Sequence, residues 1–600
     1  MKMANNKKSL LAISVASVML SGCFWDDPKF VAKYVSDQID KDAVVKHLDK
    51  LEKRAVPTPD GKAMTRAAGT KGYKKSLKYI AKKLRKAGYK VTKQEFDFRS
   101  WQELGNTNVE VDGKTLLSSK DAGEGEVPDY ATMSYSGSSN GTVTGDLVFI
   151  TPDFRFDQPD YDDTDGCETT DFNGKDVAGK IAVIQRGGCS FNAKATNAQA
   201  AGAKGVLIFN QGNNDGRKSV VQGTLGRDST VTIPTFGLRY DLGKQWYDAL
   251  ASGAISASMN VITMNQMVKT NNLLAETRHG DDDQVIMLGA HLDSVPEGPG
   301  INDNGSGSAG LLEYALILAD IGVKPKNKIR FAWWAAEEAG LIGSNYYTEE
   351  LFKPLLDEAR KQIMEELGID NPDDLTEEQQ DMVEARYNEL NNVKLYLNFD
   401  MIGSPNYIYG VMDGDLSDTK DSPDNAYTGD FTPPFGTSDI EAQFIEFFGN
   451  NGEKTVPQAL SKRSDYAGFA DWGVAFGGLF TGAEKLKSAE EVGDFGGDID
   501  VAYDKCYHRA CDDSTNVSHK ALFMNTKALT YVTTYYAMSE ELFPEPEATT
   551  QAAAKSARSF AISSEPTALK QTLRIGERLK AADSVSDHDH FHGDFDQDME

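Results

Sequence analysis

The chain has 600 residues, 40% of them hydrophobic, so it can bury a large core and is too long to be a single small domain. It carries 63 Lys and Arg against 91 Asp and Glu, which gives a formal net charge of −28. This surplus of negative charge repels the phosphates of nucleic acid and of anionic lipid headgroups. Nucleic acid is therefore excluded as an expected partner.

Residues 1–23 have the pattern of an export signal. Three lysines precede the apolar stretch Leu10–Leu20, which is too short for an ordinary membrane-spanning helix. The sequence Leu-Ser-Gly-Cys that ends at Cys23 resembles the lipobox of bacterial lipoproteins, which implies cleavage before Cys23 and lipidation of its thiol. We expect an exported chain, anchored by lipid in the cell envelope at the outer membrane, or secreted after processing. A plain signal peptide is the alternative.

Residues 30–136 have the pattern of the first part of an α/β domain. One helix is predicted from Asp42 and a second over Tyr73–Ala87, followed by a strand over Tyr89–Phe98. The next long apolar strand, Gln284–Ala290, comes much later in the chain. A separate segment is therefore inserted between these two parts.

Residues 137–263 are this insert, which we predict to be a small α/β module. Its expected elements are the strands Leu147–Ile150, Ile181–Gln185 and Val206–Phe209, the helix Asn192–Ala201, and a strand with a helix over Ile233–Leu250. The run from Asp171 to Asn210 resembles the protease-associated (PA) domain, a binding module inserted in several peptidase families. The resemblance implies no catalytic role, and it implies a disulfide between Cys167 and Cys189 that ties a surface loop.

Residues 264–543 continue the α/β pattern. The expected elements alternate as strand Val285–Ala290, helix Ser306–Ala319, strand Lys328–Ala335, a helix from Ala339, and strand Lys394–Asp400. Such alternation predicts a mixed, largely parallel central sheet flanked by helices. The charged stretch 351–392 interrupts the alternation and is predicted to be an inserted helical hairpin, either a solvated cover or a lid over the site.

Residues 544–600 are predicted to be a linker and an acidic tail. From Asp583 onward the tail has seven Asp and Glu, three His and no Lys or Arg, a composition typical of disorder. Loose capture of metal by the histidines and removal of the tail after export are the alternatives.

Four cysteines besides Cys23 lie in two close pairs, Cys167 with Cys189 and Cys506 with Cys511. An even number in an exported chain favours two disulfides. A zinc site is the alternative, although neither pair has the C-x-x-C spacing that such sites favour.

Five short segments carry acidic or His side chains, in order across the middle of the chain. Three follow apolar strands and one opens a helix, so their side chains would gather at the carboxyl edge of a parallel sheet. Zinc binds His nitrogen and carboxylate oxygen, and a pair of metals needs one bridging carboxylate. The segments therefore predict a two-metal site. Its residues come from HLDS at 291–294, INDNGSG at 301–307, WWAAEEAG at 333–340, NFDMIG at 398–403 and KCYHRACD at 505–512: His291, Asp303, Glu338, Asp400 and His508.

Acids next to these candidate ligands suggest supporting roles. Asp293 lies two residues after His291, so its side chain would fall on the same side and orient the imidazole. Glu337 and Glu338 are adjacent and would point different ways, one toward metal and one free to hold a proton. Taken alone, each segment has a plainer interpretation, such as a surface loop or an acid-rich helix N-terminus.

With RSDYAGF at 463–469 and GGLFTGAEKLKS at 477–488, the five segments resemble the secreted bacterial double-zinc aminopeptidases of metallopeptidase family twenty-eight. The resemblance covers about 41–135 and 264–543. It implies the zinc-dependent exopeptidase fold, with a peptidase domain split as 30–136 and 264–543, and two Zn²⁺ per chain. By position, His291 and Asp400 hold one zinc, Glu338 and His508 hold the other, and Asp303 bridges both.

The same resemblance implies an activity. Glu337 is the general base for a metal-bound hydroxide, Tyr507 stabilises the oxyanion, and Arg463 with Asp400 contacts the substrate. The implied reaction is hydrolysis of the N-terminal peptide bond of peptides or proteins with a free N-terminus. The family also contains glutaminyl cyclases with one zinc, carboxypeptidase-like members and catalytically inactive relatives, so a non-catalytic surface binding protein of the same fold is the alternative.

Overall fold

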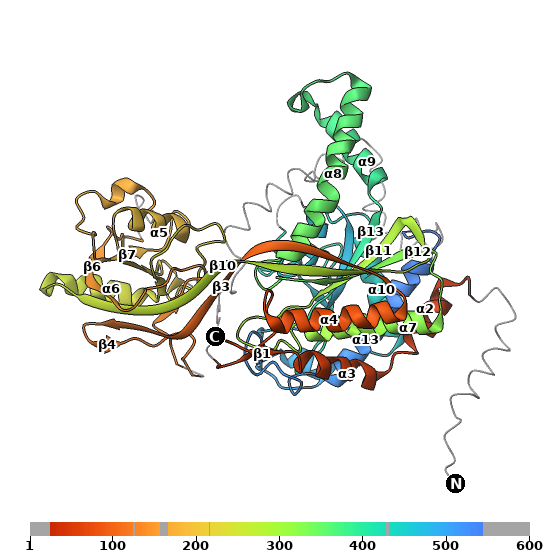
Figure 1. The fold of residues 1–600 in the computed structure, drawn as a ribbon, viewed down its shortest axis with the longest axis horizontal. Helices are drawn as coiled ribbons and strands as arrows, with labels where there is room; N and C mark the ends of the chain where they lie inside the picture. The colour runs from red at the N-terminus through yellow and green to blue at the C-terminus, as the bar shows by residue number, and fades with distance from the viewer. Residues whose placement is uncertain are drawn as a thin grey trace, which may run out of the picture. The chain divides into compact units, whose positions relative to one another are not determined.

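The computed structural model describes residues 25–543, apart from 60, 124–125, 157–165, 215–216 and 428–430. The predicted export signal, Cys23 and the tail 544–600 lie outside the described residues. Within the described part of the chain, no helix is both long and apolar enough to cross a bilayer. The described residues form two compact units (Figure 1), which we call unit 1 (those within 25–96 and 269–543) and unit 2 (those within 97–268).

Unit 1 is built on a mixed, largely parallel sheet, as predicted. Its strand order is β15-β14-β16-β13-β11-β12-β10, and the four strands β16, β13, β11 and β12 are mutually parallel. β10 and β14 join this group antiparallel. The bounds are β10 Ser256–Glu276, β11 Asp281–His291, β12 Asn327–Trp334, β13 Val393–Phe399, β14 Gly410–Met412, β15 Val456–Gln458 and β16 Ala475–Phe480.

Helices cover both faces of this sheet. α7 (Gly305–Ile321) packs on β11 and also contacts α3 (Lys41–Glu52), α4 (Lys71–Ala87) and α13 (His519–Met538). α4 ends where predicted, because Gly88 adopts the left-handed conformation (φ 95°) that favours glycine. The other helices of unit 1 are α2 (Pro28–Ser36), α8 (Ile342–Leu367), α9 (Glu377–Leu390), α10 (Thr437–Asn450), α11 (Tyr466–Asp471) and α12 (Ala489–Phe495).

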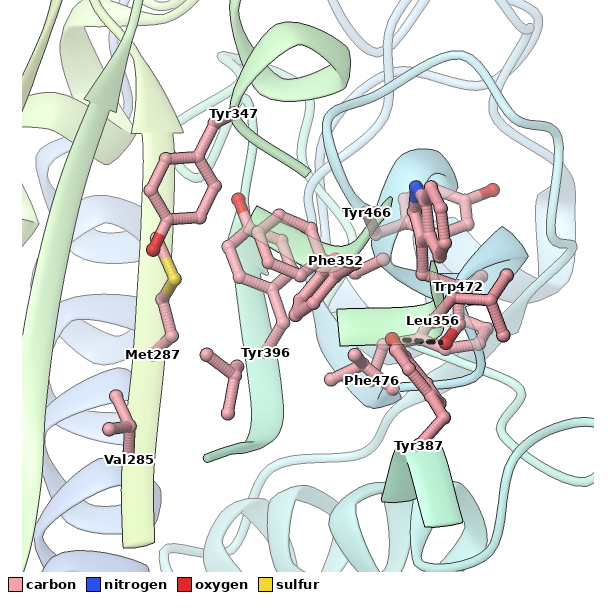
Figure 2. Close-up of a cluster of buried hydrophobic side chains, with 14 of the residues drawn as sticks. Val285, Met287, Tyr347, Phe352, Leu356, Tyr387, Tyr396, Tyr466, Trp472 and Phe476 are labelled. Carbon is pink, nitrogen blue, oxygen red and sulfur yellow. Dashed lines mark hydrogen bonds between the residues drawn. The ribbon is translucent and has the colours of Figure 1, made fainter. Parts of the chain in front are cut away.

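An aromatic core fills the space between the sheet and α8, α9 and α11. Figure 2 shows Val285 and Met287, on alternate positions of β11, with Tyr396 beside them on β13. The rings of Tyr396 and Phe469 stack with centroids 3.8 Å apart. Because alternate residues of a strand face opposite sides of a sheet, one face of β11 packs here and the other packs under α7.

The predicted hairpin over 351–392 forms, and its first helix is continuous with the helix expected from Ala339. The helix expected from Ala339 begins at Ile342, after a turn in which Leu341 has φ 55°, and it continues as α8 to Leu367. Phe352 on α8 and Tyr387 on α9 are fully buried in the aromatic core, and Tyr387 Oη donates to the carbonyl of Trp472 at 3.1 Å. The base of the hairpin is therefore part of the core, because its apolar residues face the sheet.

Unit 2 is the predicted small α/β module. β6, β7, β8 and β9 form a parallel run that β5 extends antiparallel. The unit begins at Asp97, so it includes residues that the sequence pattern assigned to the larger domain. The reason is that β3 continues past Phe98 to Val111 and pairs with β4. The bounds are β3 Lys90–Val111, β4 Lys114–Thr115, β5 Tyr130–Thr132, β6 Val143–Phe149, β7 Ile181–Gln185, α5 Phe191–Ala200, β8 Gly205–Phe209, β9 Thr235–Leu238 and α6 Tyr240–Ala249.

Candidate metal centre

The candidate site lies at the carboxyl edge of the parallel strands of unit 1. β11 ends at His291 and β13 ends directly before Asp400, while Asp303 lies just before the first turn of α7. A Cβ atom on Gly307 would lie 2.2 Å from the carbonyl oxygen of Phe399, so glycine allows α7 to begin against the end of β13. This close approach brings Asp303 and Asp400 to the same place.

The five predicted ligands form two groups that share Asp303. In the first, His291 Nε2 lies 3.2 Å from Asp303 Oδ1 and 3.2 Å from Asp400 Oδ1. In the second, His508 Nε2 lies 3.3 Å from Asp303 Oδ2 and 3.1 Å from Glu338 Oε2. Each group offers three ligand atoms close enough to hold one ion. The two oxygens of Asp303 therefore face different histidines, as a bridging carboxylate would.

Glu337 and Glu338 lie in the turn after β12 and face different histidines. Glu337 Oε2 is 3.8 Å from His291 Nε2, whereas Glu338 Oε2 is near His508. The Ala336 backbone, directly before them, is left-handed with φ 59°, and residues in this conformation cost about 1–3 kcal/mol when they are not glycine. His508 itself has φ 55°. Such backbone strain is typical of functional sites, where the surrounding structure holds it in place.

The Asp293 side chain was predicted to orient His291. The shorter contact with the imidazole comes instead from the Asp293 backbone. His291 Nδ1 donates to the main-chain oxygen of Asp293 at 3.2 Å, while the carboxylate oxygen is 3.8 Å away. The carboxylate instead accepts from the Glu337 main-chain N–H at 3.4 Å. It therefore fixes the turn that carries the two glutamates. The turn of the chain after His291 brings the carbonyl, rather than the side chain, to the imidazole.

The electrostatics of the site fit divalent cations. Burial raises the pKa of Glu338 to about 7 and raises the pKa of Glu337 well above its usual range. Burial alone would lower the pKa of His291, but Asp400 and Glu337 raise it well above its usual range. Glu338 Oε1 is buried with no hydrogen-bond partner. Buried carboxylates that repel one another, with an acceptor atom left unsatisfied, are stabilised when a cation binds between them.

A chain of hydrogen bonds holds Asp400 through Oδ2, the oxygen that does not face His291. Ser464 Oγ donates to Asp400 Oδ2 at 2.6 Å and accepts from Asn398 Nδ2 at 2.8 Å. Asn398 Oδ1 in turn accepts from Tyr396 Oη at 3.1 Å, and Tyr396 Oη accepts from Trp334 Nε1 at 2.8 Å. Ser464 belongs to the RSDYAGF motif at 463–469, but the motif alone indicated no role for its hydroxyl. Its signal was only its place beside Arg463.

A short disulfide-bonded loop carries His508 and Tyr507. Cys506 and Cys511 form a disulfide, and Cys167 and Cys189 form another in unit 2. Both predicted disulfides are therefore present. Because all four cysteines are bonded to one another, they do not form a zinc site. The rings of Tyr507 and His508 stack with centroids 3.8 Å apart. Arg463 Nη2 donates to Tyr507 Oη at 3.1 Å, and Arg463 Nη1 donates to Glu484 Oε1 at 2.6 Å. Arg463 therefore lies next to Tyr507, and its expected contact with the substrate stays a prediction.

Two buried residues that the sequence did not single out position the ligand loops. Asp512 accepts from the main-chain N–H of Asn302 at 2.8 Å and of Asp303 at 3.0 Å, so it joins the disulfide loop to the shared ligand. The fully buried Arg66 donates to three carbonyls of the loop after His291, those of Leu292, Pro299 and Gly300. Nothing in the local sequence around Arg66 indicated this, because its partners lie more than 200 residues away.

Comparison with known proteins identifies the class. The model of peptidase family M28 matches residues 272–533, and the PA domain matches residues 143–246. An aminopeptidase of Pseudomonas aeruginosa (strain UCBPP-PA14) is 40% identical over 506 residues, which cover 83% of this chain and 81% of that protein. The chain therefore belongs to peptidase family M28, with a PA domain inserted in its peptidase domain.

Solved structures share the fold. An aminopeptidase from Aneurinibacillus sp. strain AM-1 matches with a TM-score of 0.56 and 22% identity, over 86% of this chain and 98% of that one. A zinc aminopeptidase from Bacillus subtilis matches with a TM-score of 0.50 and 21% identity, over 82% of this chain and 94% of that one. At these identities the likeness concerns the fold alone.

Proposed function

We propose that this protein is an exported di-zinc aminopeptidase, which hydrolyses the N-terminal peptide bond of peptides or proteins. The observation that carries the proposal is the placement of Asp303 between two histidines, each with one further carboxylate. The 40% identical Pseudomonas relative is itself named an aminopeptidase. Export, with a lipid anchor at Cys23, is supported by the sequence of the leader.

Two zinc ions would be held by the two groups. His291 and Asp400 would hold one, His508 and Glu338 would hold the other, and Asp303 would bridge them. When bound, the ions would lower the pKa of a water to near neutrality and would polarise the substrate carbonyl. The remaining chemistry belongs to the side chains of the chain.

Glu337 is the general base in this proposal. Its carboxylate is buried and faces His291, and its raised pKa favours taking up a proton near neutral pH. It takes a proton from the attacking water and passes that proton to the departing amine. Tyr507 Oη donates to the developing oxyanion, and Arg463, which donates to the same oxygen, leaves the phenolic proton directed at the substrate.

The surplus of carboxylates explains why the enzyme would require a free N-terminus. Beyond the five ligands, Glu337 and Asp293 add negative charge within the same buried edge. A substrate ammonium group is attracted there, whereas a blocked amine brings no charge to balance the carboxylates that the two zinc ions leave unneutralised. In this proposal the inserted PA domain binds and takes no part in the chemistry.

The test compares wild-type protein with Glu337→Gln and with Glu350→Gln, a matched change at an exposed position on α8. Each protein is stripped with a chelator, reloaded with zinc, and offered aminoacyl anilides with free and with blocked amines. We expect wild type and Glu350→Gln to cleave only the free-amine set, and Glu337→Gln to bind zinc but lose most turnover. Absence of cleavage by zinc-loaded wild type would favour a binding protein, and cyclisation of N-terminal glutamine would favour a cyclase.

A further inference from the structure

α4 presents a face made only of positive charge. Residues 61–94 contain twelve Lys and Arg and no Asp or Glu, although the whole chain has a net charge of −28. On α4 the apolar positions Tyr73, Leu77, Ile80 and Leu84 are buried, and the helix contacts α7. Figure 1 shows α4 along one side of α7. The exposed positions of α4 are all basic: Lys71, Lys74, Lys75, Lys78, Lys82, Arg85 and Lys86. We call these seven side chains the cationic face.

The cationic face differs from neighbouring lysines in its ion pairing. Lysines on neighbouring elements are paired, such as Lys33 with Asp37 and Lys90 with Glu276. Among the residues that the structure describes, no ion pair involves a side chain of the cationic face. Two further basic side chains lie beside this face, because Arg54, which follows α3, lies 4.0 Å from the centroid of the Tyr79 ring, over which Lys83 of α4 also lies.

Helix stability does not explain this arrangement. Lys71 is the first residue of α4, and the positive end of the helix dipole disfavours cations in the first turn. Lys74, Lys78 and Lys82 are spaced four residues apart, where like charges repel on a helix surface. These charges therefore lower the stability of α4 in the unbound protein, and an anionic partner would relieve the repulsion between them.

We propose that the cationic face docks the protein onto an anionic phospholipid surface. The net charge of −28 does not prevent this, because charges beyond about 8 Å are largely screened at physiological ionic strength. Cys23, the expected lipidation site, precedes α2 by five residues, and five extended residues span at most about 17 Å. α2 and α4 both contact α7. A lipid at Cys23 would hold the chain near a bilayer, where a basic surface adds electrostatic attraction to anionic headgroups.

The test measures sedimentation of the full chain with lipid vesicles. All proteins carry Cys23→Ser, so no acyl group contributes, and the leader with its three lysines is the same in wild type and in both variants, so it cannot account for a difference between them. The vesicles are pure phosphatidylcholine, or phosphatidylcholine with phosphatidylglycerol. The triple variant Lys74→Gln, Lys78→Gln, Lys82→Gln is compared with a matched triple variant at exposed lysines elsewhere in unit 1, Lys324→Gln, Lys353→Gln, Lys420→Gln.

We expect binding to the phosphatidylglycerol vesicles only, weakening as salt is added. Each Lys near an anionic surface strengthens binding about fivefold, so the α4 triple variant should bind about a hundredfold more weakly, and the matched variant should bind like wild type. Thermal midpoints like wild type would show that both variants fold. Equal binding to both vesicle types, or equal binding by the two triple variants, overturns the proposal. Binding to duplex DNA without binding to anionic vesicles overturns the lipid assignment.

Discussion

Ser464→Ala is predicted to loosen one of the two ligand groups without unfolding the protein. The change removes the Ser464 hydroxyl, which donates to Asp400 Oδ2 at 2.6 Å and accepts from Asn398 Nδ2 at 2.8 Å. A hydrogen bond to a charged group contributes about 1.5–3 kcal/mol, and a buried donor left without a partner costs about 1–3 kcal/mol. Because the two effects overlap, we expect unfolding of the metal-free protein to become easier by about 2–4 kcal/mol.

The matched control is Ser76→Ala on α4. Ser76 is also fully buried, but its hydroxyl has no hydrogen-bond partner, so the same deletion should leave stability unchanged or raise it slightly. Urea denaturation of the two metal-free variants measures the difference. Equal free energies of unfolding for Ser464→Ala and Ser76→Ala would refute the reasoning.

Metal binding gives the second measurement for Ser464→Ala. Loss of a side chain that orients a ligand typically weakens metal affinity 10–100-fold. Of the five candidate ligands, Ser464 hydrogen-bonds Asp400, so zinc competition with a chelator should show one weakened ion and one ion bound as in wild type. Equal weakening of both ions would show that Ser464 acts on the whole site and not through Asp400.

Three further predictions concern other parts of unit 1. Tyr507→Phe removes the proposed oxyanion donor and should lower kcat by about 10²–10³ with little change in KM; an unchanged kcat on an aminoacyl anilide would contradict the proposed role. Burial raises the pKa of Glu441 to about 7 in the folded state, whereas its pKa in the unfolded chain is near 4.5. Between these two pH values the folded state binds the proton and the unfolded state does not, so stability falls as pH rises from about 4.5 to about 7. Glu441→Gln should therefore be more stable than wild type by about 2–3 kcal/mol at pH 8 but not at pH 4, as urea titrations at the two values will show. Phe352→Ala leaves a cavity beside the fully buried Tyr387 and should lower the free energy of unfolding by about 3–5 kcal/mol. The urea midpoint should therefore fall while kcat is retained. A midpoint like that of wild type would mean that the base of the hairpin is not part of the core.

The fold was predictable where short-range pattern decides structure. The strand Ile181–Gln185 was predicted with its observed bounds, and β11 and β13 were found from their apolar runs, because a strand buried on both faces needs apolar side chains at almost every position. α8 was predicted to begin at Ala339 and to be separate from the hairpin over 351–392, whereas it begins at Ile342 and runs without a break to Leu367. Its charged outer face obscured the apolar residues that face the core, such as Phe352.

The sequence by itself determined which residues meet at the candidate site. His291 and Asp400 each follow an apolar strand, and parallel strands end at one edge of a sheet, so order along the chain implies proximity in space. Only the tertiary structure decided how these residues are held. Ser464, Asp512 and Arg66 act through contacts between distant segments, which no local pattern encodes. The same holds for the exposed basic residues of α4, which form no ion pair with another described residue, because pairing depends on what folds beside the helix.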